Sequence, residues 1–228
     1  MARNRMISLA VGLVGAVVTA ALWSFNKTSA TYSHYMLGNI MGLFWVPMLT
    51  IILLFREGPE KFGFTLGFDK KGVWPAVCIM FGALMVVILV FGVFRWPEFQ
   101  SYYPIFRHFS DYSGVFGQTG RSPFSIDPWA AIFALASYGM YLFFWEFFFR
   151  GYLLQGLERS IGLWAILLQA VAFGLLHAGK PLVEVFASFG AGIILGVLAK
   201  KAKSFIPGFV LHWGVSLCFD LLVIAGRR

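Results

Sequence analysis

The chain has 228 residues, of which 59% are hydrophobic and only 12% are charged. The apolar residues form long runs, a pattern that excludes an ordinary soluble domain and is typical of a polytopic membrane protein. The formal charge of +8 does not indicate a nucleic-acid-binding protein, because the basic residues cluster at the ends of the apolar runs. We therefore expect an all-α, polytopic transmembrane helical bundle of about seven to eight membrane helices.

The first half of the chain contains three apolar runs that are long enough to span a bilayer core of ~30 Å. They cover approximately residues 6–25, 35–55 and 73–94. The first run is longer than the core of a usual signal peptide, so we expect a retained first helix. Cys78 and Cys218 each lie within an apolar run, and we interpret them as small buried residues rather than disulfide partners or metal ligands.

The longest break between apolar runs covers residues 95–127. It is rich in Tyr, Phe and Trp, the residue types that are enriched at membrane–water interfaces. We expect this segment to lie on the membrane surface, with His108 as an exposed or interfacial residue.

Four further helices are predicted in the second half of the chain. The fourth helix begins near Pro128, with Asp127 as its N-cap, and runs to about residue 158. The fifth, sixth and seventh cover approximately residues 161–177, 182–198 and 205–224. Gly192 and Gly196 in the sixth helix have the small-xxx-small spacing that lets two helix backbones approach closely. This motif predicts helix packing, not chemistry.

The distribution of basic residues predicts a cytoplasmic N-terminus. With seven spans, the inner side would hold Arg3, Arg5, Arg56, Lys61, Lys70, Lys71, Arg150, Arg159, Lys200, Lys201 and Lys203. The outer side would hold Lys27, Arg95, Arg107, Arg121, Lys180, Arg227 and Arg228. We expect an integral protein of the cell (inner) membrane.

The stretch 141–158, YLFFWEFFFRGYLLQGLE, carries two ionisable side chains inside an apolar helix, Glu146 and Arg150. At a spacing of four residues they share one helix face and can pair. Such groups cost roughly 2.5–3.5 kcal/mol each within a membrane, so they are rarely present without a role. Two interpretations stay open: an ion pair that orients neighbouring helices, or a carboxylate that lines a polar cavity and handles a proton.

His177 and His212 lie in later apolar runs, and helical geometry can bring them to Glu146. If the fourth and fifth helices are antiparallel, Glu146 and His177 differ in depth by only ~5 Å. Phe173 precedes His177 by one turn and would pack beside it, while His212 needs a tilt or a kink at Pro207 to reach the same level. A carboxylate and two imidazoles are typical of water activation by a general base or of a zinc site. Because the three residues come from three helices with no close pair such as H-E-x-x-H, their spacing is weak evidence for zinc.

Three motifs in the second half of the chain resemble, in the same order, those of the CAAX-protease and bacteriocin-processing (CPBP) family of intramembrane proteases. They are ExxxRG at 146–151, FxxxH at 173–177 and His212 in a late apolar run, and the continuation RGYLLQGLERSIG strengthens the match. The resemblance covers roughly residues 128–224. It implies a helical bundle that cleaves peptide bonds within or beside the bilayer.

The resemblance also implies roles for individual residues. Glu146 and His177 would activate water, while His212 and Ser216 would stabilise the oxyanion. Arg150 would hold Glu146 in place and keep it ionised. The glutamate-based mechanism needs no bound metal or other cofactor, although the family has also been described as metalloproteases.

The chain departs from the family pattern at two positions. The first motif of the family usually opens with two adjacent glutamates, but here Trp145 takes the place of the first, catalytic one and only Glu146 remains. One residue along a helix is ~100° of rotation, so Glu146 does not simply substitute for its neighbour. Ser216 stands where Asn or Asp is usual, and its hydroxyl can still donate a hydrogen bond. Asp220 could contribute instead, or it could be an acid near the membrane surface, as could Glu184.

These observations predict residues 1–127 as N-terminal membrane helices with an aromatic interfacial loop, and residues 128–228 as a CPBP-like catalytic helical core, within one integrated bundle. The expected function is intramembrane endopeptidase activity on a membrane-associated peptide or protein, with membrane lipid as the other partner. One alternative is a non-catalytic CPBP-like scaffold or bacteriocin-immunity-type protein, which Trp145 favours. Another is a transporter that uses the polar residues as a proton path, although no inverted repeats are evident.

Overall fold

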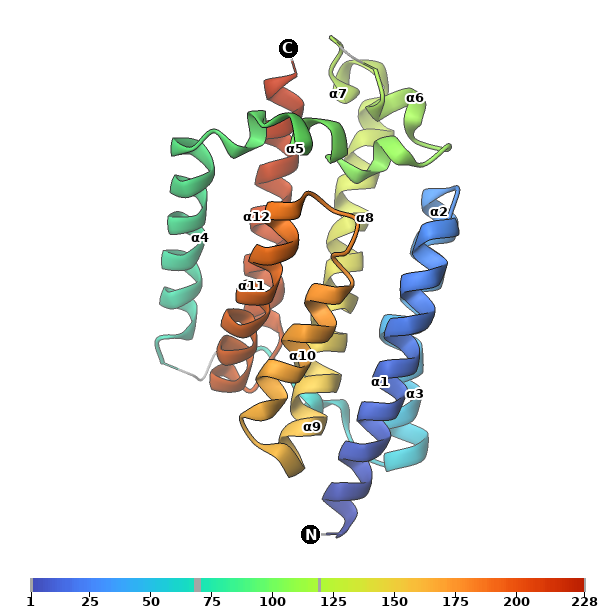
Figure 1. Ribbon diagram of the computed structural model, residues 1–228, viewed down its shortest axis with the longest axis vertical. Helices are drawn as coiled ribbons and strands as arrows, with labels where there is room; N and C mark the ends of the chain where they lie inside the picture. Colours follow the sequence, from blue (N-terminus) through green and yellow to red (C-terminus); the bar gives the residue numbers. More distant parts are fainter. Residues whose placement is uncertain (1, 68–70, 119, 228) are drawn as a thin grey trace.

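The computed structural model describes residues 2–67, 71–118 and 120–227, and in these ranges the protein is all-helical (Figure 1). Six helical segments in the described ranges are long and apolar enough to cross a membrane, with mean hydropathy between 1.5 and 2.6. They are α1 (Ala2–Thr28), the run Tyr32–Phe55, α4 (Val73–Val90), the run Pro128–Ile161, α11 (Leu182–Ala202) and α12 (Ile206–Gly226). The expected fold class, an all-α polytopic bundle, is confirmed.

Two of these segments contain π-helical turns, in which the backbone hydrogen bonds run from i to i+5. The run Tyr32–Phe55 consists of α2 (Tyr32–Ile40), η1 (Met41–Trp45), α3 (Val46–Leu49) and η2 (Thr50–Phe55). The run Pro128–Ile161 consists of α8 (Pro128–Glu146), η6 (Phe147–Leu153) and α9 (Leu154–Ile161). Because η6 is π-helical and begins directly after Glu146, the helix is locally distorted where the first motif lies.

The short helix α10 (Trp164–Leu175) differs from the expected fifth span. Its twelve residues rise only ~18 Å, less than the ~30 Å of a bilayer core. The predicted range 161–177 was too long at both ends, since the chain leaves the α-helix after Leu175 and a turn carries it through His177 and Lys180 to α11. The predicted count of seven to eight membrane helices is reached only if α10 is included with the six longer segments. This count stays a prediction.

The surface of the bundle is apolar and its interior is aromatic. Large apolar side chains such as Leu9, Val90 and Phe186 are about 70% exposed, at 74%, 73% and 69%. Exposure on this scale suits a protein whose outer face contacts lipid. Phe147 and Phe149, next to the first motif, are in contrast fully buried.

The start of α8 confirms the predicted cap. The Asp127 side chain accepts a hydrogen bond of 2.9 Å from the backbone N–H of Ala130, and Pro128 occupies the first helical position. An Asp N-cap satisfies a backbone donor that would otherwise have no partner within the helix, and proline has no N–H to lose there. This fixes where the motif-bearing helix begins.

Close packing of α10 against α11 depends on the two predicted glycines. A Cβ atom on Gly192 would lie 2.9 Å from Cα of Ala170, and one on Gly196 would lie 2.7 Å from Nε2 of Gln169. Gln169 Nε2 also donates to the Gly192 carbonyl at 2.8 Å. The small-xxx-small motif therefore marks a helix–helix contact, as predicted.

The N-terminal helix packs directly against the segment that follows the first motif. Ser8 on α1 donates a 2.7 Å hydrogen bond to the Gly156 carbonyl on α9. A Cβ atom on Gly156 would lie 2.7 Å from Val11, so the two helices are in close contact there. The polar side chain and the glycine together bring α1 alongside the motif-bearing helix.

Several short helices cover the end of the bundle that carries the C-terminus (Figure 1). They are η4 (Val93–Arg95), α5 (Pro97–Tyr102), η5 (Ile105–His108), α6 (Ser113–Phe116) and α7 (Pro123–Ile126). Arg227, after α12, donates to the carbonyls of Gln100, Tyr103 and Phe116 and so ties this layer to the last helix. The position of the layer across the helix ends fits the predicted aromatic interfacial segment.

Basic residues mark both ends of the bundle. The N-terminal end carries Arg3, Arg5, Arg56, Lys61, Lys71, Arg159, Lys200, Lys201 and Lys203, by the elements they flank, and the opposite end carries Lys27, Arg95, Arg107, Arg121, Lys180 and Arg227. Lys70 and Arg228 lie outside the described residues. Arg150 was wrongly counted as an inner-side charge, because it is fully buried within the bundle.

Candidate functional site

Glu146 at the end of α8 forms the centre of a buried polar cluster. Its Oε1 atom accepts a 2.7 Å hydrogen bond from Nδ1 of His212 on α12 and a 3.2 Å bond from Nη1 of Arg150. The Glu146 and Arg150 side chains are completely inaccessible to solvent, whereas the His212 side chain is 20% exposed. Since an ionised carboxylate can only accept hydrogen bonds, Nδ1 of His212 carries the proton.

Arg150 lies deep in the aromatic interior. Its guanidinium stands 4.0 Å from the centre of the Phe173 ring, in cation–π geometry. Within the described part of the chain, Nε and Nη2 of Arg150 and Oε2 of Glu146 are buried without a hydrogen-bond partner. The hydrogen bond to Glu146 therefore holds the guanidinium in place. It is the i,i+4 pair that the sequence predicts.

Gly208 on α12 gives the carboxylate its space. A Cβ atom at this position would lie 3.2 Å from Oε2 of Glu146 and 3.7 Å from Leu195. A contact of 3.2 Å is tighter than ordinary van der Waals contact, so a larger residue would press on the carboxylate. The close approach of α12, one turn before His212, thus depends on a glycine.

His177 packs on Phe173, the ring that also contacts the carboxylate cluster. Its Nδ1 atom donates a 2.8 Å hydrogen bond to the Phe173 carbonyl, because a carbonyl oxygen can only accept. The Phe173 ring centre lies 4.5 Å from that of His177 and 6.1 Å from that of His212. Trp145 stands with its ring centre 5.9 Å from that of His177. On α8, Trp145 is thus the residue that packs on His177, whereas Glu146 bonds His212.

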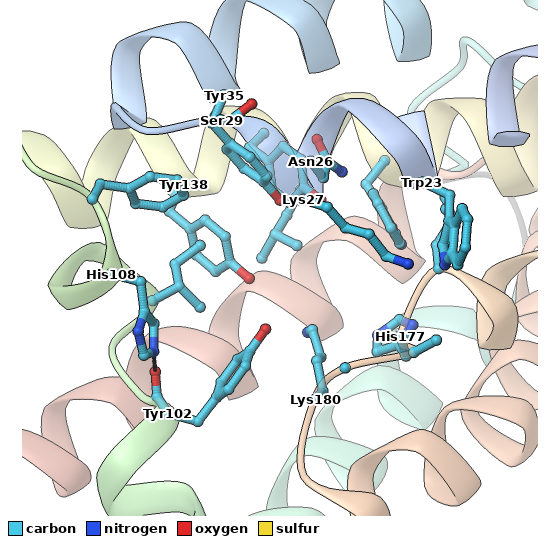
Figure 2. A pocket seen from close by; sticks show the side chains of 18 of the residues that line it. Trp23, Asn26, Lys27, Ser29, Tyr35, Tyr102, His108, Tyr138, His177 and Lys180 are labelled. Carbon is cyan, nitrogen blue, oxygen red and sulfur yellow. Dashed lines mark hydrogen bonds between the residues drawn. The ribbon is translucent and has the colours of Figure 1, made fainter. Parts of the chain in front are cut away.

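Both imidazoles line a cavity of about 390 Å³ beneath the layer of short helices. Figure 2 shows tyrosines from α2, α5 and α8 on one side of this space, with Lys27 from α1 and Lys180 from the α10–α11 turn extending toward it. Trp145 lines the same space. Each imidazole has Nδ1 bound to the protein, so Nε2 is the nitrogen that can meet a ligand in the cavity.

Lys180 belongs to a hydrogen-bonded cluster at the edge of the cavity. Its Nζ atom lies 2.8 Å from Oε1 of Glu184, and the Tyr103 hydroxyl donates to the same carboxylate at 2.6 Å. Burial acts to lower the pKa of Lys180, but the Glu184 carboxylate and the neighbouring Tyr102 and Tyr35 phenols together outweigh it and the pKa is raised, so the ammonium stays charged. Burial and the same carboxylate raise the pKa of the Tyr103 phenol well above its usual value, so this hydroxyl stays protonated.

The structure brings the predicted residues together only in part. Glu146, Arg150 and His212 form one cluster, and Phe173 connects it to His177. The expectation that the Glu146 side chain lines the cavity was wrong, because it is completely buried behind the cavity wall. Successive side chains on a helix point ~100° apart, so Trp145 points to the cavity while its neighbour Glu146 points to α12.

Ser216 and Asp220, the other candidates on α12, lie away from the cavity wall. Ser216 follows His212 by one turn and is partly buried, and neither residue is among those that line the cavity. Asp220 is 2% exposed, and its Oδ1 atom has no hydrogen-bond partner among the described residues. It is a buried carboxylate.

Several residues that line the cavity were not predicted as site residues from the sequence. Lys180 and Lys27 were interpreted only as outer-side basic residues, while Tyr35 and Tyr141 were not singled out. Their hydroxyls form a 2.9 Å hydrogen bond in which Tyr35 is the donor. The position of Lys180 three residues after His177 was a usable signal, because a short turn keeps both near one place.

The arrangement does not fit a metal ion. In residues 2–67, 71–118 and 120–227, no three His, Cys, Asp or Glu side chains lie close enough together to hold one. Arg150 and His212 already share Oε1 of Glu146, and His177 contacts Trp145 instead of the carboxylate. The polar atoms of these side chains are engaged in hydrogen bonds within the protein.

A comparison with known protein families finds one match in the second half of the chain. Residues 127–218 match the family described as Rce1-like, type II CAAX prenyl endopeptidase Rce1-like. The match contains α8, α10, α11 and most of α12, and hence all the residues of the polar cluster. Neither a search of curated proteins nor a search of solved structures finds a match.

Proposed function

Since residues 127–218 match the Rce1-like family of type II CAAX prenyl endopeptidases, we propose that the protein is an intramembrane endopeptidase in which His212 is the general base. The observation that carries this proposal is the 2.7 Å hydrogen bond from His212 Nδ1 to Glu146, made by a histidine that also lines the cavity. The bond fixes the tautomer, so Nε2 has a lone pair directed away from the carboxylate. In many catalytic dyads and triads, a carboxylate orients the histidine that acts as the general base in the same way.

The proposed reaction begins with a water molecule held between the two imidazoles. In the neutral rings, Nε2 of His212 and Nε2 of His177 are both acceptors, and a water molecule has two hydrogens to donate. As the water oxygen attacks the peptide carbonyl carbon, His212 takes one proton and the carbonyl becomes an oxyanion. His212 then returns the proton to the leaving amine, and the carbon–nitrogen bond breaks.

The oxyanion needs a donor, and the tyrosine wall of the cavity provides a candidate. The Tyr141 hydroxyl accepts from Tyr35 and therefore keeps its own proton for another acceptor. Tyr141 also lines the cavity. We assign oxyanion stabilisation to this hydroxyl, in place of the role implied for Ser216.

Glu146 and Arg150 act through His212 in this scheme. A fully buried carboxylate has no access to a substrate, so Glu146 is a positioning residue that also stabilises the imidazolium formed during catalysis. Arg150 compensates the buried negative charge. In this proposal His212 activates the water molecule, whereas the family pattern implies that role for Glu146.

The family description makes a prenylated peptide with a C-terminal CAAX sequence a suitable probe substrate. The experiment measures cleavage of an internally quenched, farnesylated CAAX peptide by the protein in liposomes. His212→Ala should reduce cleavage by about 100-fold or more, the usual contribution of a general base. His34→Ala, at an exposed histidine outside the cavity, is the matched control and should cleave at the native rate.

A non-catalytic role is the second candidate, and Trp145 favours it. This indole lines the cavity at the position where the family motif has its first glutamate, so the cavity wall has a ring where relatives have a carboxylate. If neither the native protein nor its His212→Ala variant cleaves the probe above the rate of empty liposomes, while both fold, this candidate replaces the first.

We also propose an integral membrane location with a cytoplasmic N-terminus. More of the described basic residues flank the N-terminal end of the bundle than the opposite end. Labelling single cysteines placed at the exposed residues Arg3 and Arg121 with a membrane-impermeant reagent in intact cells tests this orientation. Only the cysteine at position 121 should react.

A further inference from the structure

An apolar groove runs along the outside of the bundle between α1 and α10. Its volume is about 590 Å³, and its wall includes Gly12, Ala16 and Ala20 from α1. On α10 the groove is bordered by Leu168 and Leu175, which are 51% and 55% exposed and so face the bilayer. Small residues on α1 opposite leucines on α10 leave a channel for an apolar chain.

The groove continues into the cavity that holds the two histidines. Trp23, Leu176 and Ala178 line both spaces. From Gly12 to Trp23 the groove follows eleven residues of α1, a rise of ~16 Å. This is about half of the ~30 Å core of a bilayer, the depth that one leaflet's acyl chains fill.

The cavity end of this combined space is basic. Lys27 and Lys180 line it, and no Asp or Glu is among the described residues of its wall. Lys180 bonds Glu184 behind the wall, so its charge is partly compensated. Lys27 is an exposed residue whose Nζ atom lies 3.2 Å from the centre of the Trp23 ring, with no carboxylate contact among the described ion pairs. The space is thus cationic at the membrane surface and apolar below it.

We propose that the groove and the cavity together bind one anionic phospholipid from the leaflet on the side of the α1 C-terminus. One acyl chain lies in the groove, and the headgroup phosphate lies at the cavity mouth between Lys27 and Lys180. Charge complementarity selects this occupant. A zwitterionic choline lipid would bring a quaternary ammonium close to two lysines, and an uncharged lipid would leave their charges without a partner. The proposal requires that the chain spans a membrane, but it does not depend on hydrolysis.

The experiment is native mass spectrometry of the purified full-length protein released from detergent after incubation with defined lipids. The probes are phosphatidylglycerol and phosphatidylcholine with identical acyl chains, and free oleate. The native protein should retain one phosphatidylglycerol at least about fivefold better than phosphatidylcholine, as expected from roughly 1 kcal/mol for each basic residue near the lipid. Lys27→Gln should reduce this preference by a similar factor.

A pair of neighbouring alanines on α1 tests the groove. Ala20 lines it and Ala21 does not, and both are exposed. Ala20→Phe should block the acyl chain and lower phosphatidylglycerol retention about tenfold, while Ala21→Phe should retain it as the native protein does. Thermal unfolding in detergent without lipid should be the same for the two variants, which separates lost binding from lost folding.

Three results would overturn the proposal. Equal retention of the two phospholipids by the native protein would show that charge does not select the occupant. Equal retention by Ala20→Phe and Ala21→Phe would show that the chain does not enter the groove. Retention of oleate but not of phosphatidylglycerol would identify a free fatty acid as the occupant.

Discussion

The Glu146 carboxylate on α8 accepts a 2.7 Å hydrogen bond from Nδ1 of His212 on α12, sixty-six residues later in the chain. This bond joins the first motif to the last across the bundle. The two residues have different surroundings, because Glu146 is fully buried while His212 lines the cavity. Only His212 can therefore contact a substrate.

Arg150→Ala should destabilise the protein as well as inactivate it. The substitution removes the charged partner of the buried Glu146 carboxylate, which costs about 3–5 kcal/mol for a buried ion pair. Thermal unfolding in detergent, followed by near-ultraviolet circular dichroism, measures this loss. Arg121→Ala, at an exposed arginine, is the control and should unfold at the native temperature. An unchanged midpoint for Arg150→Ala would show that the pair contributes nothing to stability.

Gly208→Ala should lower the cleavage rate with little effect on stability. The added methyl group would lie 3.2 Å from Oε2 of Glu146, so the carboxylate must shift and its bond to His212 must change. A misplacement of about 1 Å can cost roughly 100-fold in rate, so a smaller shift of His212 that follows its carboxylate partner should cost on the order of tenfold. Gly190→Ala is the matched control, because a methyl group on Gly190 meets nothing within 4 Å. Native activity in Gly208→Ala would mean that the position of the carboxylate is not critical.

Trp145→Glu should reduce both stability and cleavage. The Trp145 ring packs on Phe149 and His177, and the loss of a large buried aromatic ring typically costs about 3–5 kcal/mol. Trp145→Phe keeps a ring in the same place and should retain most of the activity. Cleavage assays on both variants make the comparison. A faster rate for Trp145→Glu than for the native protein would favour the non-catalytic candidate, because the restored glutamate would then create the activity.

Much of the fold could be predicted from the sequence, because apolar run length and cap chemistry are local properties. The helix from Pro128, its Asp127 cap and the Gly192 contact all follow from such signals. The length of α10 could not be predicted in this way. Leu176 and Ala178 are compatible with a helix, yet the chain forms a turn after Leu175 that carries His177 and Lys180.

The residues of the polar cluster could be predicted from the sequence, but the directions in which their side chains point could not. Spacing showed that Glu146 and Arg150 could pair and that Glu146 could meet a histidine. It could not show which histidine, because tilt and the π-helical segment η6 decide which side chain faces which helix. The structure pairs Glu146 with His212, although helical depth matched Glu146 better with His177.

The most direct test of the central claim compares cleavage of the farnesylated, internally quenched peptide by the native protein and by Glu146→Gln in liposomes. Glutamine keeps the shape of the side chain, but it can turn either its oxygen or its NH2 group toward Nδ1, so it no longer enforces the His212 tautomer, and it has no charge to stabilise the imidazolium. We predict a loss in kcat of about 100-fold or more, with unchanged KM and a folded protein. Glu98→Gln, at an exposed glutamate, should cleave at the native rate. Native kcat in a folded Glu146→Gln variant would contradict the account, since the carboxylate would then neither orient nor support the base.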